Sequence, residues 1–139
     1  MKKIILPVLI ILQFIFLFSC SKKEEKKGIN FGKAKVKIEN DTYNFGTINK
    51  GEVVEAEFVI KNISDVPFII RSAKATTCDC TTVSSWTKKE IYKGEEAKIK
   101  VIFDSNKSKG GDQKKSITLL TNSSNIYIIL TLKGNVKVS

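Results

Sequence analysis

Two cysteines one residue apart are the strongest candidates for chemistry in this chain of 139 residues. Cys78 and Cys80 flank Asp79, and the only other cysteine, Cys20, ends an apolar N-terminal run. In an extended strand both thiols would lie on one face, with Cα atoms about 6.5–7 Å apart. That separation is at the upper limit for a disulfide, so a bond would require a bend in the chain. A strained, exposed disulfide would be reduced easily, as in thiol redox proteins.

Metal binding and a purely structural role are the other two interpretations of this pair. Two thiolates could supply half of a tetrahedral zinc site or hold copper(I). The chain has no histidine, so carboxylates or a second chain would have to complete such a site. Alternatively, the thiols behave as small buried apolar groups or form a local staple. The spacing alone leaves all three interpretations open.

The lack of histidine also removes the commonest general base and the commonest metal ligand. No Ser/His/Asp set can therefore exist, and no zinc-protease helix occurs. We predict that the protein is not an enzyme, with no catalytic residues and no cofactor.

The N-terminus has the pattern of a secretory signal peptide. Lys2 and Lys3 give a positive start, and the next 15 residues, up to Phe18, are almost wholly apolar. A membrane-spanning helix needs about 20 such residues. The end of the run, Leu17-Phe18-Ser19-Cys20, resembles the bacterial lipoprotein box, in which a peptidase cuts before a cysteine that carries diacylglycerol. We therefore predict that residues 1–19 are removed.

Cys20 is then the predicted attachment point for lipid, including an acyl chain such as palmitate. Two or more acyl chains give stable anchoring, at about 0.8 kcal/mol per buried CH₂. Residues 20–34 form a predicted tether, because Ser21 to Gly28 contains no apolar residue that could join a core. Lys23-Glu24-Glu25 resembles the signal that directs some Gram-negative lipoproteins to the cell surface. The predicted location is the cell envelope of a Gram-negative bacterium, on the outer membrane, facing the periplasm or the cell surface.

From about residue 35 onward, apolar and polar residues alternate with the period of a β-strand. In the clearest run, Val54, Ala56, Phe58 and Ile60 alternate with Glu55, Glu57 and Lys61. Residues 126–132 are dense in aliphatic side chains and predict a central or final strand. We expect residues 83–87 to be short and irregular, and residues 104–112 to form a mobile loop. About seven or eight short strands favour an all-β, immunoglobulin-like antiparallel sandwich over residues 35–139, with a small barrel as the second architecture.

Several short motifs occur together in this domain. In chain order they are Tyr43-Asn44-Phe45-Gly46, Phe58-Val59-Ile60-Lys61-Asn62, Cys78-Asp79-Cys80-Thr81, Tyr92-Lys93-Gly94, Ile99-Lys100-Val101-Ile102-Phe103-Asp104 and Leu132-Lys133-Gly134. This order resembles the bacterial family called domain of unknown function 1573, over about residues 40–136. That family is similar to the immunoglobulin-like domains of the abnormal-spindle and Hydin type. It usually has Cys-Gly-Cys where this chain has Asp79. The resemblance implies the fold and export, and it brings no activity.

The function predicted from the sequence is that of a membrane-anchored binding or assembly module in the envelope. Its partners would be the membrane, through lipid on Cys20, and another envelope protein. The loop Asp104 to Asp112 is the longest candidate for binding. One alternative is a thiol redox or metal-handling protein that uses Cys78 and Cys80. A weaker alternative is a surface adhesin for glycans, with Trp86 and Tyr92 as stacking rings.

The formal net charge of +10 could favour an anionic partner such as nucleic acid. The basic residues are scattered, however, and an exported protein does not meet nucleic acid. We therefore predict no nucleic-acid partner.

Overall fold

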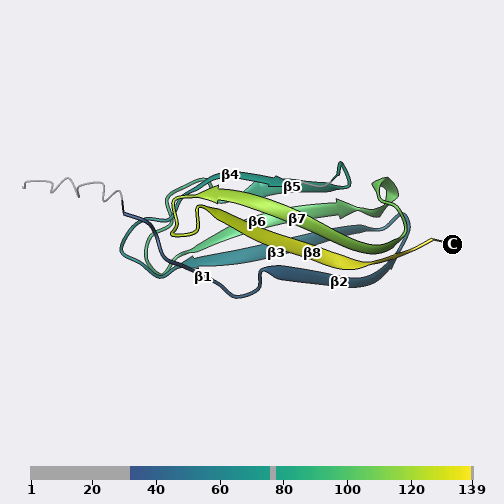
Figure 1. The fold of residues 1–139 in the computed structure, drawn as a ribbon, viewed down its shortest axis with the longest axis horizontal. Coiled ribbons are helices and arrows are strands. Elements are labelled where there is room, and N and C mark those ends of the chain that lie inside the picture. The colour runs from purple at the N-terminus through teal and green to yellow at the C-terminus, as the bar shows by residue number, and fades with distance from the viewer. Residues whose placement is uncertain (1–31, 76–77, 139) are drawn as a thin grey trace, which may run out of the picture.

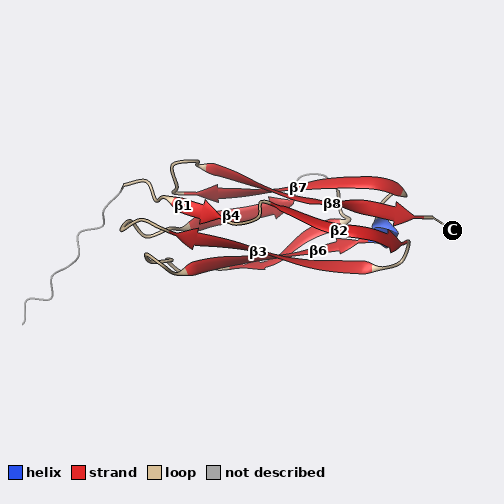
Figure 2. Ribbon diagram, turned by 90° about the horizontal axis from the view of Figure 1, so that it is seen from below, coloured by secondary structure: helices blue, strands red, loops and turns tan. Residues whose placement is uncertain are grey.

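The computed structural model describes residues 32–75 and 78–138. The predicted signal peptide, Cys20 and most of the predicted tether lie outside these residues. The described chain forms two four-stranded sheets that face each other, with β3 and β6 on one side and β7 and β8 on the other (Figures 1 and 2). In order, the elements are β1 (Val36–Ile38), β2 (Thr42–Asn49), β3 (Val53–Asn62), β4 (Ile70–Ala75), β5 (Thr81–Trp86), β6 (Glu96–Asp104), the 3-10 helix η2 (Ser105–Lys107), β7 (Gly111–Thr121) and β8 (Tyr127–Lys137). The predicted all-β sandwich is confirmed.

The first sheet has the strand order β1-β3-β6-β5, and all its pairs are antiparallel. β3 and β6 form its centre, and their register runs from Val53 opposite Asp104 to Lys61 opposite Glu96. In both strands mostly charged outward residues alternate with apolar inward ones, which directs one set of side chains into the core and the other to solvent.

The second sheet has the order β2-β8-β7-β4. β7 and β8 pair antiparallel, from Gly111 opposite Val136 to Leu120 opposite Tyr127. β2 runs parallel to β8, which departs from the fully antiparallel arrangement that we predicted. The chain leaves β1 in the first sheet and continues into β2 in the second sheet after only three residues, so it keeps its direction (Figure 1).

The core lies between the two sheets and is built from the inward residues of both. The largest fully buried apolar side chains are Phe68, Phe103, Ile60, Ile91, Ile99, Ile117, Leu119, Leu130, Leu132, Val101 and Val136. The ring of Phe45 on β2 stacks on Phe103 of β6, with centroids 5.1 Å apart, so an edge strand of one sheet is packed against the centre of the other.

The structure corrects one strand-level prediction in part. Residues 83–86 belong to β5, which pairs with β6 from Thr81 to Trp86, and the expected irregularity is a register shift between Val83 and Ser85. The last residue of the predicted tether also packs against the domain. Ala34 is fully buried, its N–H donates to the carbonyl of Asn122, and it forms a bridge with Ser123.

Candidate functional site

The Cys78-Asp79-Cys80 segment lies in the connection between β4 and β5 and forms a turn. The extended geometry that we considered is therefore wrong. The turn brings the two Cα atoms to 5.1 Å, and a disulfide joins Cys78 to Cys80. The N–H of Thr81 donates to the carbonyl of Cys78, at 3.2 Å, and the N–H of Asp104 donates to the carbonyl of Cys80, at 2.8 Å. These bonds fix the turn beside the C-terminal end of β6.

The two cysteines differ in their access to solvent. Cys80 is 1% exposed and belongs to the core, whereas Cys78 and Asp79 are exposed. An external thiolate could therefore attack only the sulfur of Cys78, which would leave the Cys80 thiolate to depart. Among residues 32–75 and 78–138, no group of three or more Cys, Asp or Glu side chains is close enough to hold a metal ion.

Trp86 and Tyr92 do not form a pair of exposed rings. Trp86 is partly buried and packs against the core, as expected for a large aromatic side chain, and the Nζ of Lys88 lies 5.2 Å from its ring centroid. Tyr92 is 52% exposed, and its hydroxyl donates to Oε2 of Glu90 at 2.9 Å. This hydrogen bond, together with the negative charge of Glu90, raises the pKa of the Tyr92 phenol above its usual value.

The segment from Asp104 to Asp112, which we predicted to be a mobile loop, is bonded to the rest of the domain, and its role in binding stays a prediction. It contains η2, and Ser105 is buried, with its hydroxyl donating to the carbonyl of Glu52 at 2.6 Å and accepting from the N–H of Gly51 at 2.9 Å. The Nζ of Lys50 donates to the carbonyl of Ser108. The segment is thus fastened to the turn between β2 and β3.

The outer face of the second sheet is a candidate surface that sequence reasoning missed. We call it the uncharged face and define it by Ser72, Ser116, Thr118, Leu120, Tyr127, Ile129 and Thr131. These residues face outward, because their strand neighbours such as Ile117, Leu119, Ile128 and Leu130 are buried in the core. Tyr127 is 66% exposed and Ile129 is 59% exposed.

A sequence signal for this face was present. In β3 and β6 most apolar residues alternate with charged ones, whereas residues 126–130 are apolar at every position. That density predicts a central or final strand, and β8 lies in the interior of its sheet and is also the last strand of the described chain. A strand that is apolar on both sides, in a sheet with one solvent face, indicates an exposed apolar surface.

Two sheets packed face to face around one core define the class as an immunoglobulin-like β-sandwich domain. The sequence profile of the protein family of unknown function DUF1573 matches residues 36–136. The chain therefore belongs to this family, as its motifs suggested.

Solved structures support the fold. A protein of unknown function from Porphyromonas gingivalis W83 is 16% identical, with a TM-score of 0.66 over 75% of this chain and 47% of that one. This chain thus spans about half the length of that protein. The ASH/PapD-like domain 7 of human CEP192 is 16% identical, with a TM-score of 0.57 over 76% of this chain and 87% of that one. Part of the VesB protease of Vibrio cholerae is similar at 15% identity and a TM-score of 0.55, over 76% of this chain and 32% of that one.

A search of curated protein sequences found no match. At these identities the structural likenesses show the fold alone. Within the described residues, no helix has the length and apolar character needed to span a bilayer.

Proposed function

We propose that this protein is a lipid-anchored envelope protein whose immunoglobulin-like domain binds another envelope protein through the uncharged face. The observation that carries the proposal is the exposure of Tyr127 and Ile129, two residues apart at the start of β8, an interior strand of its sheet. Large apolar side chains gathered on a solvent face are characteristic of interaction sites. Aromatic residues are enriched in the centres of protein interfaces.

The neighbours of these two residues extend the surface across strands. Leu120 lies directly opposite Tyr127 and Thr118 directly opposite Ile129. Cross-strand neighbours share one face of a sheet, so these four side chains form a continuous patch. Its chemistry suits the apolar centre of a protein–protein contact.

The border of the patch indicates the charge of the partner. Lys74, Lys114 and Lys133 occupy outward positions around it, as their registers with Thr118 and with each other show. A second copy of the same face would bring lysines against lysines, which disfavours a symmetric dimer. A partner with an apolar patch bordered by carboxylates fits better.

The anchor rests on the sequence of residues 17–20 and supports the same proposal. The described chain enters the sandwich at one end, and the C-terminus lies at the other (Figure 1). A tether that joins the domain at its end leaves both sheet faces accessible to a partner. Cys20→Ser should abolish incorporation of labelled palmitate and release the protein from membranes. Retention of the label would contradict the anchor.

The binding proposal is tested with two matched lysine substitutions in the full chain. Ile129→Lys places a charge in the uncharged face, whereas Val53→Lys places one at a residue of the first sheet with nearly equal exposure, 57% against 59%. After gentle extraction from membranes, native gel mass should fall to that of the single chain for Ile129→Lys and stay with a larger complex for Val53→Lys. Equal behaviour of the two variants would contradict the proposal.

A thiol redox function at Cys78 and Cys80 is the second candidate, favoured by the exposure of Cys78 beside the buried Cys80. In exchange, an incoming thiolate bonds to the sulfur of Cys78, the disulfide breaks, and the electron pair leaves on the sulfur of Cys80. Trapping free thiols in cells should then reveal a reduced fraction that rises when a reductant is added. If the disulfide stays fully oxidised under mild reductant, its role in the turn is structural and the redox candidate is contradicted.

A further inference from the structure

A second surface lies on the edge where the chain passes from the first sheet to the second. β1 covers only one end of β3, from Val36 opposite Asn62 to Ile38 opposite Ile60. Beyond Ile38 the chain crosses to the other sheet as β2. From Val53 to Val59, β3 therefore has no strand partner on this side among the described residues.

The backbone on this edge points its polar groups outward. The N–H of Asn62 donates to Glu95 and its carbonyl accepts from Gly94, so Asn62 is bonded on the β6 side. The N–H of Ile63 donates to Lys35, on the β1 side. Successive residues of a strand bond on alternate sides. Glu55, Glu57 and Val59 accordingly direct their N–H and C=O groups toward the uncovered edge.

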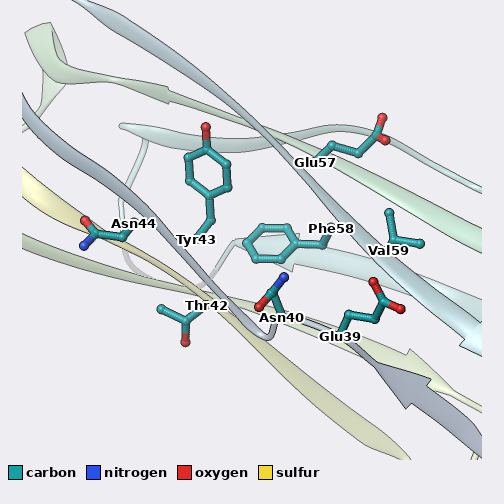
Figure 3. A pocket seen from close by; sticks show the side chains of 8 residues that line it. All are labelled: Glu39, Asn40, Thr42, Tyr43, Asn44, Glu57, Phe58 and Val59. Atoms are coloured by element: carbon teal, nitrogen blue, oxygen red, sulfur yellow. The ribbon is translucent and has the colours of Figure 1, made fainter.

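A groove of about 340 Å³ lies at this edge, between β3 and the edge of β2. Figure 3 shows Tyr43 and Phe58 side by side at its centre, with Glu39, Glu57 and Val59 to one side of the rings and Asn44 to the other. The two rings meet edge to face, with centroids 6.4 Å apart. Phe58 is buried and Tyr43 is 36% exposed, so the centre of the groove is apolar.

The charge of the groove contrasts with that of the chain. The chain has a formal net charge of +10, yet the ionisable side chains that line the groove, apart from Tyr43, are Glu39 and Glu57. Glu57 makes one exposed ion pair, with Lys98 at 3.2 Å, and no ion pair joins Glu39 to another described residue. Exposed pairs of this kind are weak, so a cationic ligand group could compete for Glu57.

We propose that this groove binds an extended segment of another protein, which adds to β3 as a strand where β1 ends. The segment is basic, with Lys or Arg side chains near Glu39 and Glu57 and an apolar side chain against Tyr43 and Phe58. Main-chain hydrogen bonds to Glu55, Glu57 and Val59 supply affinity, and the alternate side chains supply selectivity. This site is on the strand edge and does not depend on the uncharged face.

The test begins with a random library of short linear peptides, selected against the full chain in detergent. Selected peptides should alternate apolar residues with Lys or Arg. The best peptide, made synthetically, then serves as the probe. Methylation of its alternate backbone nitrogens should abolish binding, because an added strand needs those N–H groups.

Protein variants and amide exchange locate the peptide. The double variant Glu39→Lys/Glu57→Lys should weaken binding about tenfold or more, whereas the control Glu96→Lys, the same reversal of charge at one residue of β6, should stay within about twofold. Peptide binding should slow hydrogen exchange of the Glu57 and Val59 amides, while those of Ala56 and Phe58, already bonded to β6, change little.

The proposal is overturned if the library yields no basic alternating sequence, or if the peptide tolerates backbone methylation. It is also overturned if exchange at Glu57 and Val59 is unaffected by a bound peptide. A thermal melt of each variant shows that the fold is retained. Failure of this test would not affect the proposal for the uncharged face, since the lysine substitutions at Ile129 and Val53 test that surface separately.

Discussion

The two outer faces of the sandwich differ although the two inner faces are built alike. On the first sheet, β3 and β6 carry charges at most outward positions, and each apolar residue lies opposite a charged one: Val53 opposite Asp104, Ile102 opposite Glu55, and Val59 opposite Lys98. We call this surface the charged face. On the uncharged face, Tyr127 lies opposite Leu120, Ile129 opposite Thr118, and Thr131 opposite Ser116.

This difference shows that folding constrains the inner faces of the two sheets but not their outer faces. Both sheets must bury their inner residues, and both do. Folding places no such demand on an outer face, for which charged residues are the ordinary solution. An outer face that departs from this solution therefore reports on a role outside the fold, which we take to be contact with a partner.

The largest expected contrast lies between two adjacent residues of β8. Leu130 is fully buried and Ile129 is 59% exposed. Leu130→Ala should lower the free energy of unfolding by about 2–5 kcal/mol through lost burial and a cavity. Ile129→Ala should cost less than about 1 kcal/mol, mainly through β-propensity. Urea unfolding of the purified full chain measures both. Equal losses would mean that the chain itself covers Ile129, and the comparison would fail.

A smaller loss in the free energy of unfolding is expected at Gly134, a residue of β8 that packs against an aromatic ring. A Cβ added at Gly134 would overlap the ring of Phe45, which is the ring that stacks on Phe103. Gly134→Ala should therefore cost about 1–3 kcal/mol, because the displaced ring disturbs the core. The neighbouring Lys133→Ala faces solvent and should stay within about 0.5 kcal/mol in the same urea series. If Gly134→Ala leaves the free energy of unfolding unchanged, packing against Gly134 does not fix the position of the Phe45 ring.

The smallest effect concerns charge pairing across strands. On the charged face, Glu57 lies opposite Lys100 and also pairs with Lys98. Beside the uncharged face, Lys114 lies directly opposite Lys133. Like charges in that position are unfavourable, so Lys114→Glu should stabilise the domain by about 0.2–1 kcal/mol at low salt.

Added salt should shrink this gain, since both side chains are exposed. Thermal melts at low and high salt would check the change. A destabilising Lys114→Glu would show that the lysine pair supports the fold and does not serve a partner.

The sequence predicted the parts of the fold that depend on local alternation. The runs at Val54 to Lys61 and Ala97 to Phe103 predicted β3 and β6, because the alternation of apolar and polar residues indicates which side chains face the core. β5 was missed because Thr81 to Trp86 mixes Thr, Val and Ser without alternation and carries an irregularity near Ser84. The parallel pairing of β2 with β8 joins segments far apart in the chain, and no local pattern encodes it.

The candidate sites were predicted less well. The sequence singled out Cys78 and Cys80, but whether they meet depends on the turn that encloses Asp79. The loop at 104–112 looked mobile because its residues are polar, whereas Ser105 uses that polarity to bond to the turn at Gly51 and Glu52. The groove at Tyr43 and Phe58 exists only because β1 is short, which is a property of strand pairing and not of residue type.

The most direct test of the central claim measures whether the uncharged face is covered in the cell. Single cysteines at Ile129 (Ile129→Cys) and Val53 (Val53→Cys) report on two residues of nearly equal exposure in the isolated domain. N-ethylmaleimide should label both quickly in the purified protein, with the Cys78–Cys80 disulfide left intact. In intact cells, the account predicts that the cysteine at 53 still reacts and that the one at 129 is protected. Equal labelling of both positions in cells would contradict it.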